Sequence, residues 1–314
     1  MTGFINALPG AISQGLIWGI MAIGVFLTYR ILDLADLTVD GSFCTGGAVC
    51  VMMIAAGHNV WFAMLCAFLV GMLAGMVTGI FHTLCGIPAI LAGILTQLAL
   101  WSINLAIMGM KANQSININN HDLLVSLRYL QDVSKGTRPF YEHPIFVVAL
   151  FTIGIIIVLY WFFGTELGAS IRATGANGNM ARAQGINTDA NKVLGLMISN
   201  GLVALSGSLL TQYNSFADIN MGRGAIVIGL AAVIIGEVVF SKIFRNFGLK
   251  LLAVSIGAII YYIVIQAVIS LSGINSNYMK LISAVIVAIF LTVPYWKGRY
   301  FSKKRVKTGG GANA

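Results

Sequence analysis

Charged side chains are scarce in this sequence: they make up 9% of its 314 residues, whereas soluble domains carry about 25%. Apolar residues make up 58%, and the mean hydropathy is +0.88. These values exclude a soluble globular domain and identify an integral membrane protein. The net charge of +9 does not indicate binding to nucleic acid, because the basic residues lie between and after the apolar runs, where membrane topology places them.

The motifs of common catalytic sites are also missing. The sequence contains no H-E-x-x-H, no G-x-S-x-G and no His/Cys cluster with the spacing of metal ligands, so neither an enzyme nor a metal site is indicated. G-x-x-x-x-G-K-[ST] is absent too, so any ATP that drives this protein must be bound by another subunit. The N-terminus lacks a basic region, so no cleavable signal peptide is expected.

Nine apolar runs are long enough to cross a bilayer, for which an α-helix needs about 17–25 residues. Lipid offers no partner to open backbone groups, so the sequence predicts an all-α, polytopic transmembrane bundle of about nine (8–10) helical spans. Two of the runs, 41–57 and 224–240, are short, rich in Gly and preceded by polar residues. The predicted spans are 9–29, 41–57, 60–81, 86–108, 144–163, 193–213, 224–240, 251–271 and 278–296.

The distribution of Lys and Arg orients these spans. With the N-terminus outside and the C-terminus inside, most of the 19 basic residues fall on the inner side, as the positive-inside rule requires. Residues 1–296 then form the transmembrane domain, and residues 297–314 form a basic cytoplasmic tail that adjoins anionic lipid. The long outer loop, 109–143, contains a leucine pattern that predicts a short amphipathic helix.

Residues 164–192 form the main polar break in the second half of the chain. The composition indicates two short helices around a turn at 176–178, with Asn179 as the cap of the second and Gly185 at its end. Small side chains on a short helix allow close approach by another protein, so the segment is either a cytoplasmic docking site or an ordinary cytoplasmic loop. The candidate docking residues are Gly168, Ala169, Arg172, Ala173, Gly175, Asn177, Ala181, Arg182, Ala183 and Gly185.

Two similar lead-ins precede the short spans. Residues 35–41 and 217–222 both read Ala-Asp, apolar, polar, apolar. In the predicted topology the two spans run in opposite directions, as in an inverted repeat, and such repeats indicate the pathway of a transporter. The alternative is two unrelated helix starts, each with an acidic residue near a favourable helix N-terminus.

Polar side chains within the spans are few. Gln97, Trp101 and Asn104 share one stripe of a predicted helix, and such residues either bond helix to helix or line a path. Apart from Glu237, near the end of its span, no span holds an Asp, Glu, Lys or Arg well inside the membrane, which disfavours an ion-coupled carrier. The candidate path residues are Asp36, Thr38, Asp40, Ser42, Gln97, Asn104, Asn200, Asp218 and Asn220.

The runs 172–177 (RATGAN) and 181–187 (ARAQGIN) look like the cytoplasmic coupling segment of bacterial ABC importer permeases of the branched-chain amino acid and ribose type. The run 33–42 is similar to the stretch before the second span in that family, and span number and order agree over nearly the whole chain. The run 217–237 looks most like the branch associated with aromatic or related amino acids. Residues 164–192 are therefore named the coupling segment.

This resemblance implies a permease of the bacterial inner (plasma) membrane that works as a homodimer and carries no cofactor of its own. Two P-loop ATPase subunits, which hold ATP and Mg, would dock on the coupling segment, with Arg172 or Arg182 pairing with acidic groups there. An external binding protein would deliver a small solute, an amino acid or a related compound. Gly175→Leu or Ala181→Trp is then expected to abolish transport. An ATP-independent channel or secondary facilitator is the alternative; it explains the short spans equally well but not the coupling segment.

Overall fold

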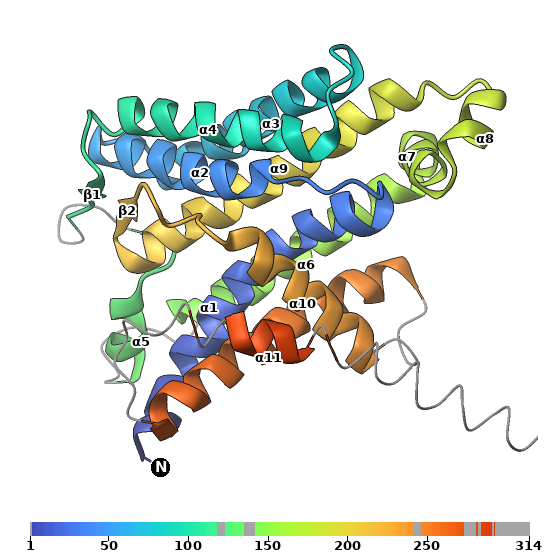
Figure 1. Ribbon diagram of the computed structural model, residues 1–314. Helices are drawn as coiled ribbons and strands as arrows, with labels where there is room; N and C mark the ends of the chain where they lie inside the picture. Colours follow the sequence, from blue (N-terminus) through green and yellow to red (C-terminus); the bar gives the residue numbers. More distant parts are fainter. Residues whose placement is uncertain are drawn as a thin grey trace, which may run out of the picture.

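The computed structural model describes residues 2–117, 123–134, 142–240, 246–272, 281, 284–290 and 292. Helices dominate the described chain (Figure 1). In order, the elements are α1 (Thr2–Phe26), η1 (Leu27–Ile31), α2 (Thr38–Ala55), α3 (Val60–Thr83), α4 (Ala89–Ile107), β1 (Asn113–Ser115), α5 (Leu127–Ser134), α6 (Pro144–Gly164), α7 (Glu166–Ala176), α8 (Gly178–Ala183), α9 (Thr188–Asn214), β2 (Phe216–Asp218), α10 (Ala225–Phe240) and α11 (Phe247–Ser272).

The predicted all-α polytopic bundle is confirmed. Within the described residues, seven helices are long and apolar enough to cross a membrane, and α10 is a shorter apolar helix. Eight of the nine predicted spans therefore appear. Apart from the start of α1, which lies seven residues before the predicted start, their ends agree with the prediction to within five residues. The ninth, 278–296, lies mostly outside the described residues, although 284–290 are helical, and the predicted tail 297–314 lies wholly outside them.

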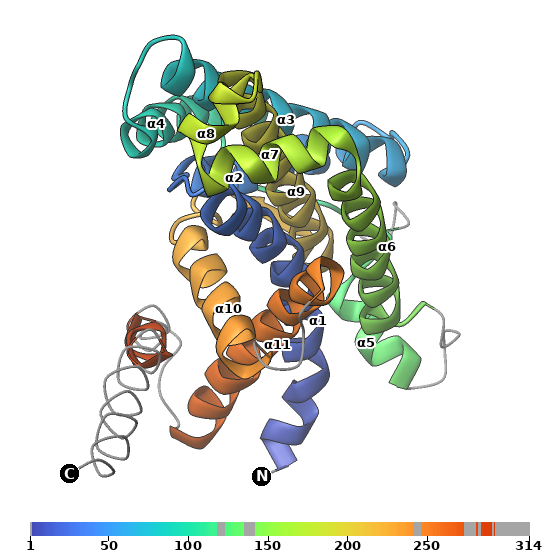
Figure 2. The same cartoon turned by 90° about the vertical axis from the view of Figure 1, so that its right-hand side faces the viewer.

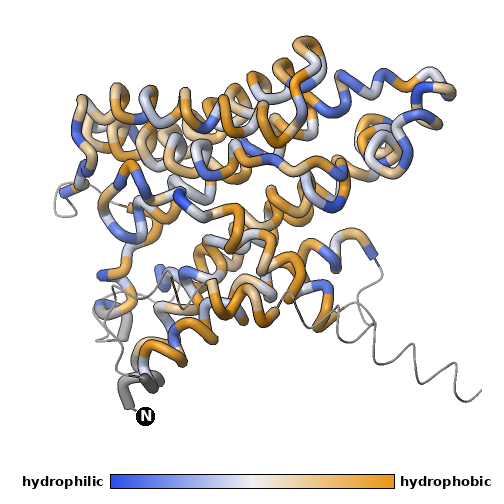
Figure 3. Tube along the Cα trace, in the orientation of Figure 1, coloured by the Kyte–Doolittle hydropathy of each residue, from blue (hydrophilic) through white to orange (hydrophobic). Residues whose placement is uncertain are grey.

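The helices form two groups, α2, α3 and α4 in one and α1, α6, α10 and α11 in the other, with α9 between them (Figures 1 and 2). Helices α1 and α9 are the most enclosed, because 83% and 78% of their most apolar stretches are buried, whereas the value for α6 is 17%. Apolar residues predominate along the helices (Figure 3). Helix α6 contains no charged residue, and its Leu150, Ile157 and Trp161 side chains are exposed, as expected of a helix that faces lipid.

Glycines let α2 and α9 approach backbone to backbone. A Cβ atom on Gly46 would collide with the carbonyl of Ala204, and one on Gly207 would collide with the carbonyl of Phe43. Small residues at helix contacts are typical of membrane bundles, where van der Waals packing drives helix association. This close contact places the polar side chains of α2 and α9 against each other.

The two ends of the bundle differ. At one end, named the β1 end, β1 pairs antiparallel with β2, with Asn113 opposite Asp218. The predicted amphipathic helix of the long loop is present beside it as α5, although its Leu127 side chain is exposed. At the other end, named the α7 end, α7 and α8 lie across the tips of the long helices (Figure 2).

Helices α2 and α10 begin inside the bundle. Residues 32–37 run inward from the α7 end, and residues 215–224 run inward from the β1 end (Figure 1). The two lead-ins meet at Asp40, whose carboxylate accepts hydrogen bonds from the backbone N–H of Gly224 (2.9 Å) and of Ile226 (3.0 Å). Asp40, in the first turn of α2, therefore caps the N-terminus of α10. Helices interrupted within the membrane are the form in which transporters build their pathways.

Candidate translocation path and coupling site

Four of the predicted path residues meet in the interior of the bundle. The Asn200 Nδ2 group donates to Asp36 (2.7 Å), and the Ser42 hydroxyl donates to Asn200 Oδ1 (2.7 Å). The backbone N–H of Thr38 donates to Asp36 Oδ1 (2.9 Å). All four residues are buried. Asn200 lies twelve residues beyond Thr188, the first residue of α9, or about 18 Å along its axis, which places this contact deep in the bundle.

Two threonines that sequence reasoning missed extend this group. The hydroxyl of Thr78 lies 2.6 Å from that of Thr38 and donates to that of Thr96 (2.9 Å). Threonine is common in membrane helices, so no sequence signal distinguished this pair. The resulting set bonds α2, α3, α4 and α9 together through its own members. It is named the buried polar cluster and comprises Asp36, Thr38, Ser42, Thr78, Thr96 and Asn200.

Three other predicted path residues, Asp40, Gln97 and Asn104, line a separate pocket of about 210 Å³. The pocket lies between α2, α4 and the lead-in to α10. It is named the α4 pocket and is lined by Asp40, Gly41, Cys44, Gln97, Leu98, Trp101, Asn104, Ile219 and Arg223.

Several polar groups in the α4 pocket lack partners. Asn104 is 1% exposed, yet its Oδ1 atom accepts no hydrogen bond from the described residues. Its Nδ2 group donates to the Gly41 carbonyl at 3.4 Å. Within the described part of the chain, the side chains of Gln97 and Arg223 have no hydrogen bond or ion pair. Asn104 Oδ1 and the side chains of Gln97 and Arg223 are therefore free to bind something else.

Arg223 indicates what surrounds this face of the bundle. Its exposed side chain shares the pocket with Gln97, which lies eight residues beyond the start of α4, about 12 Å along the helix. A charged side chain at such a depth faces protein or a water-filled cavity, because contact with hydrocarbon costs several kcal/mol. Sequence reasoning missed Arg223, because the residue appeared to belong to an outer loop. Only the inward course of the lead-in carries it to this depth.

Asp218 and Asn220 do not line the α4 pocket. Asp218 Oδ1 accepts a hydrogen bond from the backbone N–H of Asn220 (2.7 Å). Asp36 and Thr38 make the same two-residue turn at 2.9 Å. The two lead-ins thus share this hydrogen bond as well as a sequence pattern, and the inverted repeat stays a prediction.

A second cavity is a different feature. It is a groove of about 870 Å³ between α6 and the α3–α9 pair, lined by apolar side chains such as Trp61, Phe151 and Leu202. A polar solute would lose its hydrogen bonds to water there without gaining others, and that loss is costly. The groove therefore suits lipid chains and not a path for a polar solute.

The coupling segment folds as the two predicted short helices, α7 and α8, with the break at Asn177. The predicted cap was wrong: Asn177 and not Asn179 caps α8, because its Oδ1 atom accepts from the backbone N–H of Met180 (3.1 Å). An N-cap side chain must precede the first helical residue, and α8 begins at Gly178, two residues earlier than the prediction required. Gly185 follows the helix with a φ of +81°, in the left-handed region that favours glycine.

The candidate docking residues divide between two faces of the coupling segment. Gly168 and Gly175 pack against this chain's own backbone, because added Cβ atoms would collide with Phe163 and with the Ile31 carbonyl, and Ala181 is also buried. Ala173 is half-buried. The exposed candidates are Ala169, Arg172, Asn177, Arg182, Ala183 and Gly185.

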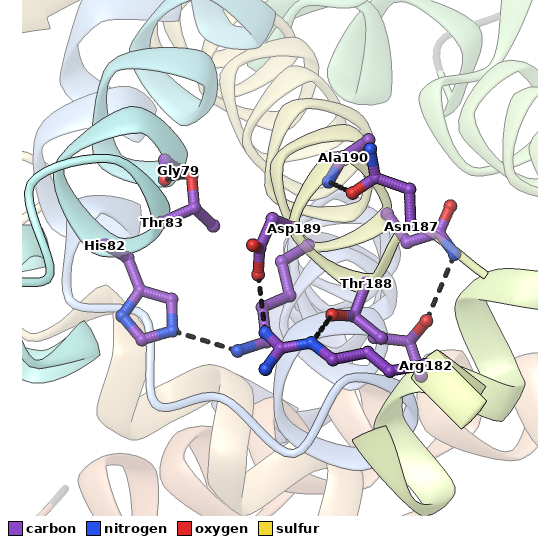
Figure 4. A network of polar contacts seen from close by, with 11 residues as sticks. Gly79, His82, Thr83, Arg182, Asn187, Thr188, Asp189 and Ala190 are labelled. Atoms are coloured by element: carbon purple, nitrogen blue, oxygen red, sulfur yellow. Dashed lines mark hydrogen bonds and ion pairs between the residues drawn. The ribbon is translucent and has the colours of Figure 1, made fainter. Parts of the chain in front are cut away.

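Arg182 already has partners within the chain (Figure 4). Its Nε donates to the hydroxyl of Thr188 (2.6 Å), and its guanidinium pairs with Asp189 (2.9 Å). Beside it, His82 at the end of α3 lies 3.4 Å from the Lys192 ammonium of α9. These contacts join α8 to the first turn of α9, so Arg182 holds the coupling segment in place.

A chain of contacts leads from the coupling segment into the bundle. Gly175 packs on Ile31 in η1, the π-helical turn that ends the first span. One residue earlier, Arg30 forms an ion pair with Glu237 of α10 (2.9 Å). Glu237, the single acidic residue noted within a predicted span, therefore pairs with a cation at the α7 end. The N-terminus of the same α10 is capped by Asp40 at the α4 pocket.

Comparison with known proteins places this chain among transport proteins. Residues 8–291 match the family described as "Branched-chain amino acid transport system / permease component". The tyrosine transport system permease protein of Clostridioides difficile is 39% identical over 93% of this chain and 91% of that protein. The ribose import permease protein RbsC of Escherichia coli is 24% identical over 92% of this chain and 85% of that protein. Among solved structures, PsaBC from Streptococcus pneumoniae in complex with Fab shares the fold, with a TM-score of 0.53 and 16% identity over 95% of this chain and 94% of its own.

Proposed function

The chain belongs to the family of branched-chain amino acid transport permeases, and from that premise we propose that two copies of it form the pathway of an ATP-driven importer for an aromatic amino acid or a close relative. The chain is a transmembrane permease subunit of an ABC importer. The relative named for tyrosine, at 39% identity, supports the amino acid. The relative named for ribose is less similar, at 24% identity, so a sugar is less well supported than an amino acid.

The α4 face supports pairing with a second copy. Arg223 is exposed on this face at a depth where lipid would be a costly neighbour. A second permease across a two-fold axis would enclose the face and leave a polar passage between the copies. This arrangement also keeps the apolar outer face of α6 in lipid.

The coupling segment is the proposed docking site for a P-loop ATPase subunit, which would bind ATP and Mg. The observation that carries this proposal is a pair of large apolar side chains, Leu167 (57% exposed) and Met180 (63% exposed), on two short helices outside the membrane-spanning segments. Arg172 adds an exposed positive charge on α7. Exposed apolar side chains rimmed by polar ones are typical of protein interfaces. The docking surface is thus defined as Leu167, Ala169, Arg172, Met180 and Ala183.

Movement of the ATPases would reach the pathway through contacts within this chain. Movement of α7 would be transmitted to η1 where Gly175 packs against the Ile31 carbonyl. The contact is tight, because a Cβ atom added to Gly175 would collide with that carbonyl. The Arg30–Glu237 pair then links η1 to α10, whose other end lies at the α4 pocket. A bundle of this kind switches by rigid-body movement of helices, which suits inward-open and outward-open states.

The distribution of basic residues supports an α7 end in the cytoplasm and a cytoplasmic C-terminus. The β1 end then faces outward, where β1, β2 and α5 offer a surface to an external binding protein. Delivery of the solute by that protein removes the need for a high-affinity site in the permease.

The test replaces one methionine at each end of the molecule. Met180→Asp places a charge on the docking surface, whereas Met110→Asp changes another exposed methionine (73%, against 63% for Met180) next to β1. Each variant is purified with its associated subunits, and both the bound P-loop ATPase and ATP-driven uptake of L-tyrosine in proteoliposomes are measured. Met180→Asp is expected to lose both, and Met110→Asp to retain the bound ATPase.

Retention of the ATPase by Met180→Asp would refute docking at this surface. A wild-type permease that purifies without an ATPase and conducts solute without ATP would instead be a channel or facilitator. The substitutions Gly175→Leu and Ala181→Trp are less informative than their positions in the sequence suggested. Both residues pack inside this chain, so their loss of transport would report disturbed folding as well as lost docking.

A further inference from the structure

We propose that the α4 pocket is a weak recognition site for the zwitterionic head of an α-amino acid, one site in each permease, beside the pathway. The inference rests on the proposed function and adds to it a place where the permease itself distinguishes its solute. It is based on the residues that line the pocket and on their hydrogen-bonding groups that have no partner among the described residues.

The carboxylate of the solute has two unpartnered donors available. Arg223 presents a planar guanidinium with five N–H groups, whose forked geometry matches a carboxylate. The Gln97 amide, half-buried on α4, adds a neutral donor on the same wall. Neither side chain is engaged with the described residues, so binding would break no existing bond.

The ammonium group of the solute has complementary acceptors. Asn104 Oδ1 is buried without a partner, while the contact from its Nδ2 group to Gly41 holds the amide in this orientation. The Asp40 carboxylate lies on the same pocket. It accepts two backbone hydrogen bonds, from Gly224 and Ile226, and a carboxylate offers about four acceptor positions, so it keeps capacity and negative charge for a cation.

The size of the pocket limits what it holds. At about 210 Å³ it is smaller than the range of about 300–1,000 Å³ that is usual for complete ligand sites. The pocket therefore takes the charged head, and the side chain of the solute extends past Trp101, which is 44% exposed on the pocket wall. An aromatic ring there would favour an apolar or aromatic side chain. The second permease would cover the rest of the solute.

The experiment measures binding without the external protein. The permease is purified with its ATPase subunits, and its melting temperature is followed over millimolar additions of L-phenylalanine, a soluble aromatic zwitterion. Phenethylamine lacks the carboxylate, 3-phenylpropionate lacks the ammonium, and D-ribose is a neutral polar control. L-phenylalanine is expected to raise the melting temperature progressively as its concentration increases, and the other three compounds are not.

Variants assign the effect to the pocket. Arg223→Gln and Asn104→Leu should abolish the shift, whereas Lys111→Gln, which removes another exposed cation towards the β1 end, should leave it unchanged. The proposal is overturned if either single-charge analogue gives the same shift, if the shift survives Arg223→Gln, or if L-phenylalanine gives none. A measurement of ATP-driven uptake by the complete wild-type transporter distinguishes failure of the proposed site from failure of the proposed function. Uptake without a shift removes the site and leaves the proposed function standing, whereas the absence of uptake of any amino acid removes both.

Discussion

The buried polar cluster and the α4 pocket both lie within the membrane-spanning bundle, and both draw side chains from α2 and α4. In the cluster, Asp36, Ser42 and Asn200 satisfy one another at hydrogen-bond distances of 2.7 Å. In the pocket, Asn104 Oδ1 has no partner among the described residues, and Arg223 is exposed without an ion pair. Two asparagine side chains that are equally buried therefore differ: the hydrogen bonds of Asn200 are made, whereas Asn104 Oδ1 has no partner among the described residues.

The difference separates two uses of polar residues in a membrane. A cluster whose hydrogen bonds are all made holds the helices together, because removal of any member would leave its neighbours without hydrogen-bond partners. An unsatisfied buried acceptor costs about 1–3 kcal/mol and is seldom kept unless something else binds it. The state of the hydrogen bonds, more than the type of residue, distinguishes structural polar groups from those that border a pathway.

The largest expected effect comes from breaking the cluster. Asn200→Leu would leave the Asp36 carboxylate and the Ser42 hydroxyl without their shared amide, so stability should fall by about 3 kcal/mol. The melting temperature and the monodisperse yield in detergent measure this loss. Asn104→Leu is the matched variant in the pocket, and it should keep the yield of wild type. Equal destabilisation by the two substitutions would remove the distinction between the regions.

A smaller effect is expected at Asp40, where the cap of α10 borders the pocket. Asp40→Ala removes the acceptor of the Gly224 and Ile226 N–H groups and should cost about 1 kcal/mol, the usual value of a helix cap. Asp40→Asn keeps a capping oxygen and should recover most of that stability. Thermal unfolding in detergent compares the two. If Asp40→Asn is as unstable as Asp40→Ala, the cap is not what holds the lead-in.

The threonine chain should contribute less again. Thr78→Val removes the bonds to Thr38 and Thr96 while nearly preserving the shape of the side chain. Hydrogen bonds between membrane helices are worth about 0.6 kcal/mol on average, so the melting temperature should fall only slightly. Transport should continue near the wild-type rate, because these threonines do not line the α4 pocket. A severe loss of transport would show that the cluster belongs to the path.

The smallest change in stability is expected at the ion pair of η1 and α10. The Arg30 and Glu237 side chains are 59% and 36% exposed, so Glu237→Gln should alter stability by less than about 1 kcal/mol. Its effect should appear in the number of solute molecules imported per ATP hydrolysed, because the pair connects the coupling segment to α10. If the number of solute molecules imported per ATP does not change, the Arg30–Glu237 pair does not transmit movement from the coupling segment to α10.

The membrane spans followed from the sequence because hydrophobicity and length are local properties. Helix α6 contains 21 residues without a charge, and its predicted ends agree with the structure to one residue. The break of the coupling segment at residues 176–178 was also local, since turn chemistry identified it. The cap was misplaced by two residues, at Asn179 in place of Asn177, because helix boundaries depend on which backbone groups find partners.

The candidate site was predicted only in part. Gln97 and Asn104 lie on one wall of the α4 pocket, as their helical spacing indicated. Composition marked Gly175 and Ala181 as a docking surface, yet both pack inward, because a small residue suits a contact within the chain as well as one with a partner. No local pattern distinguishes these two uses.

The sequence by itself determined the class of the protein, its spans and its family. These depend on hydropathy summed over windows of about 20 residues and on motifs that are contiguous in the chain. Only the tertiary structure decided which polar residues are satisfied and which are free. Asn200 and Asp36 are 164 residues apart, and Arg223 reaches the α4 pocket only because its lead-in descends into the bundle to meet Asp40. Such pairings depend on how the helices pack, which no local window of sequence contains.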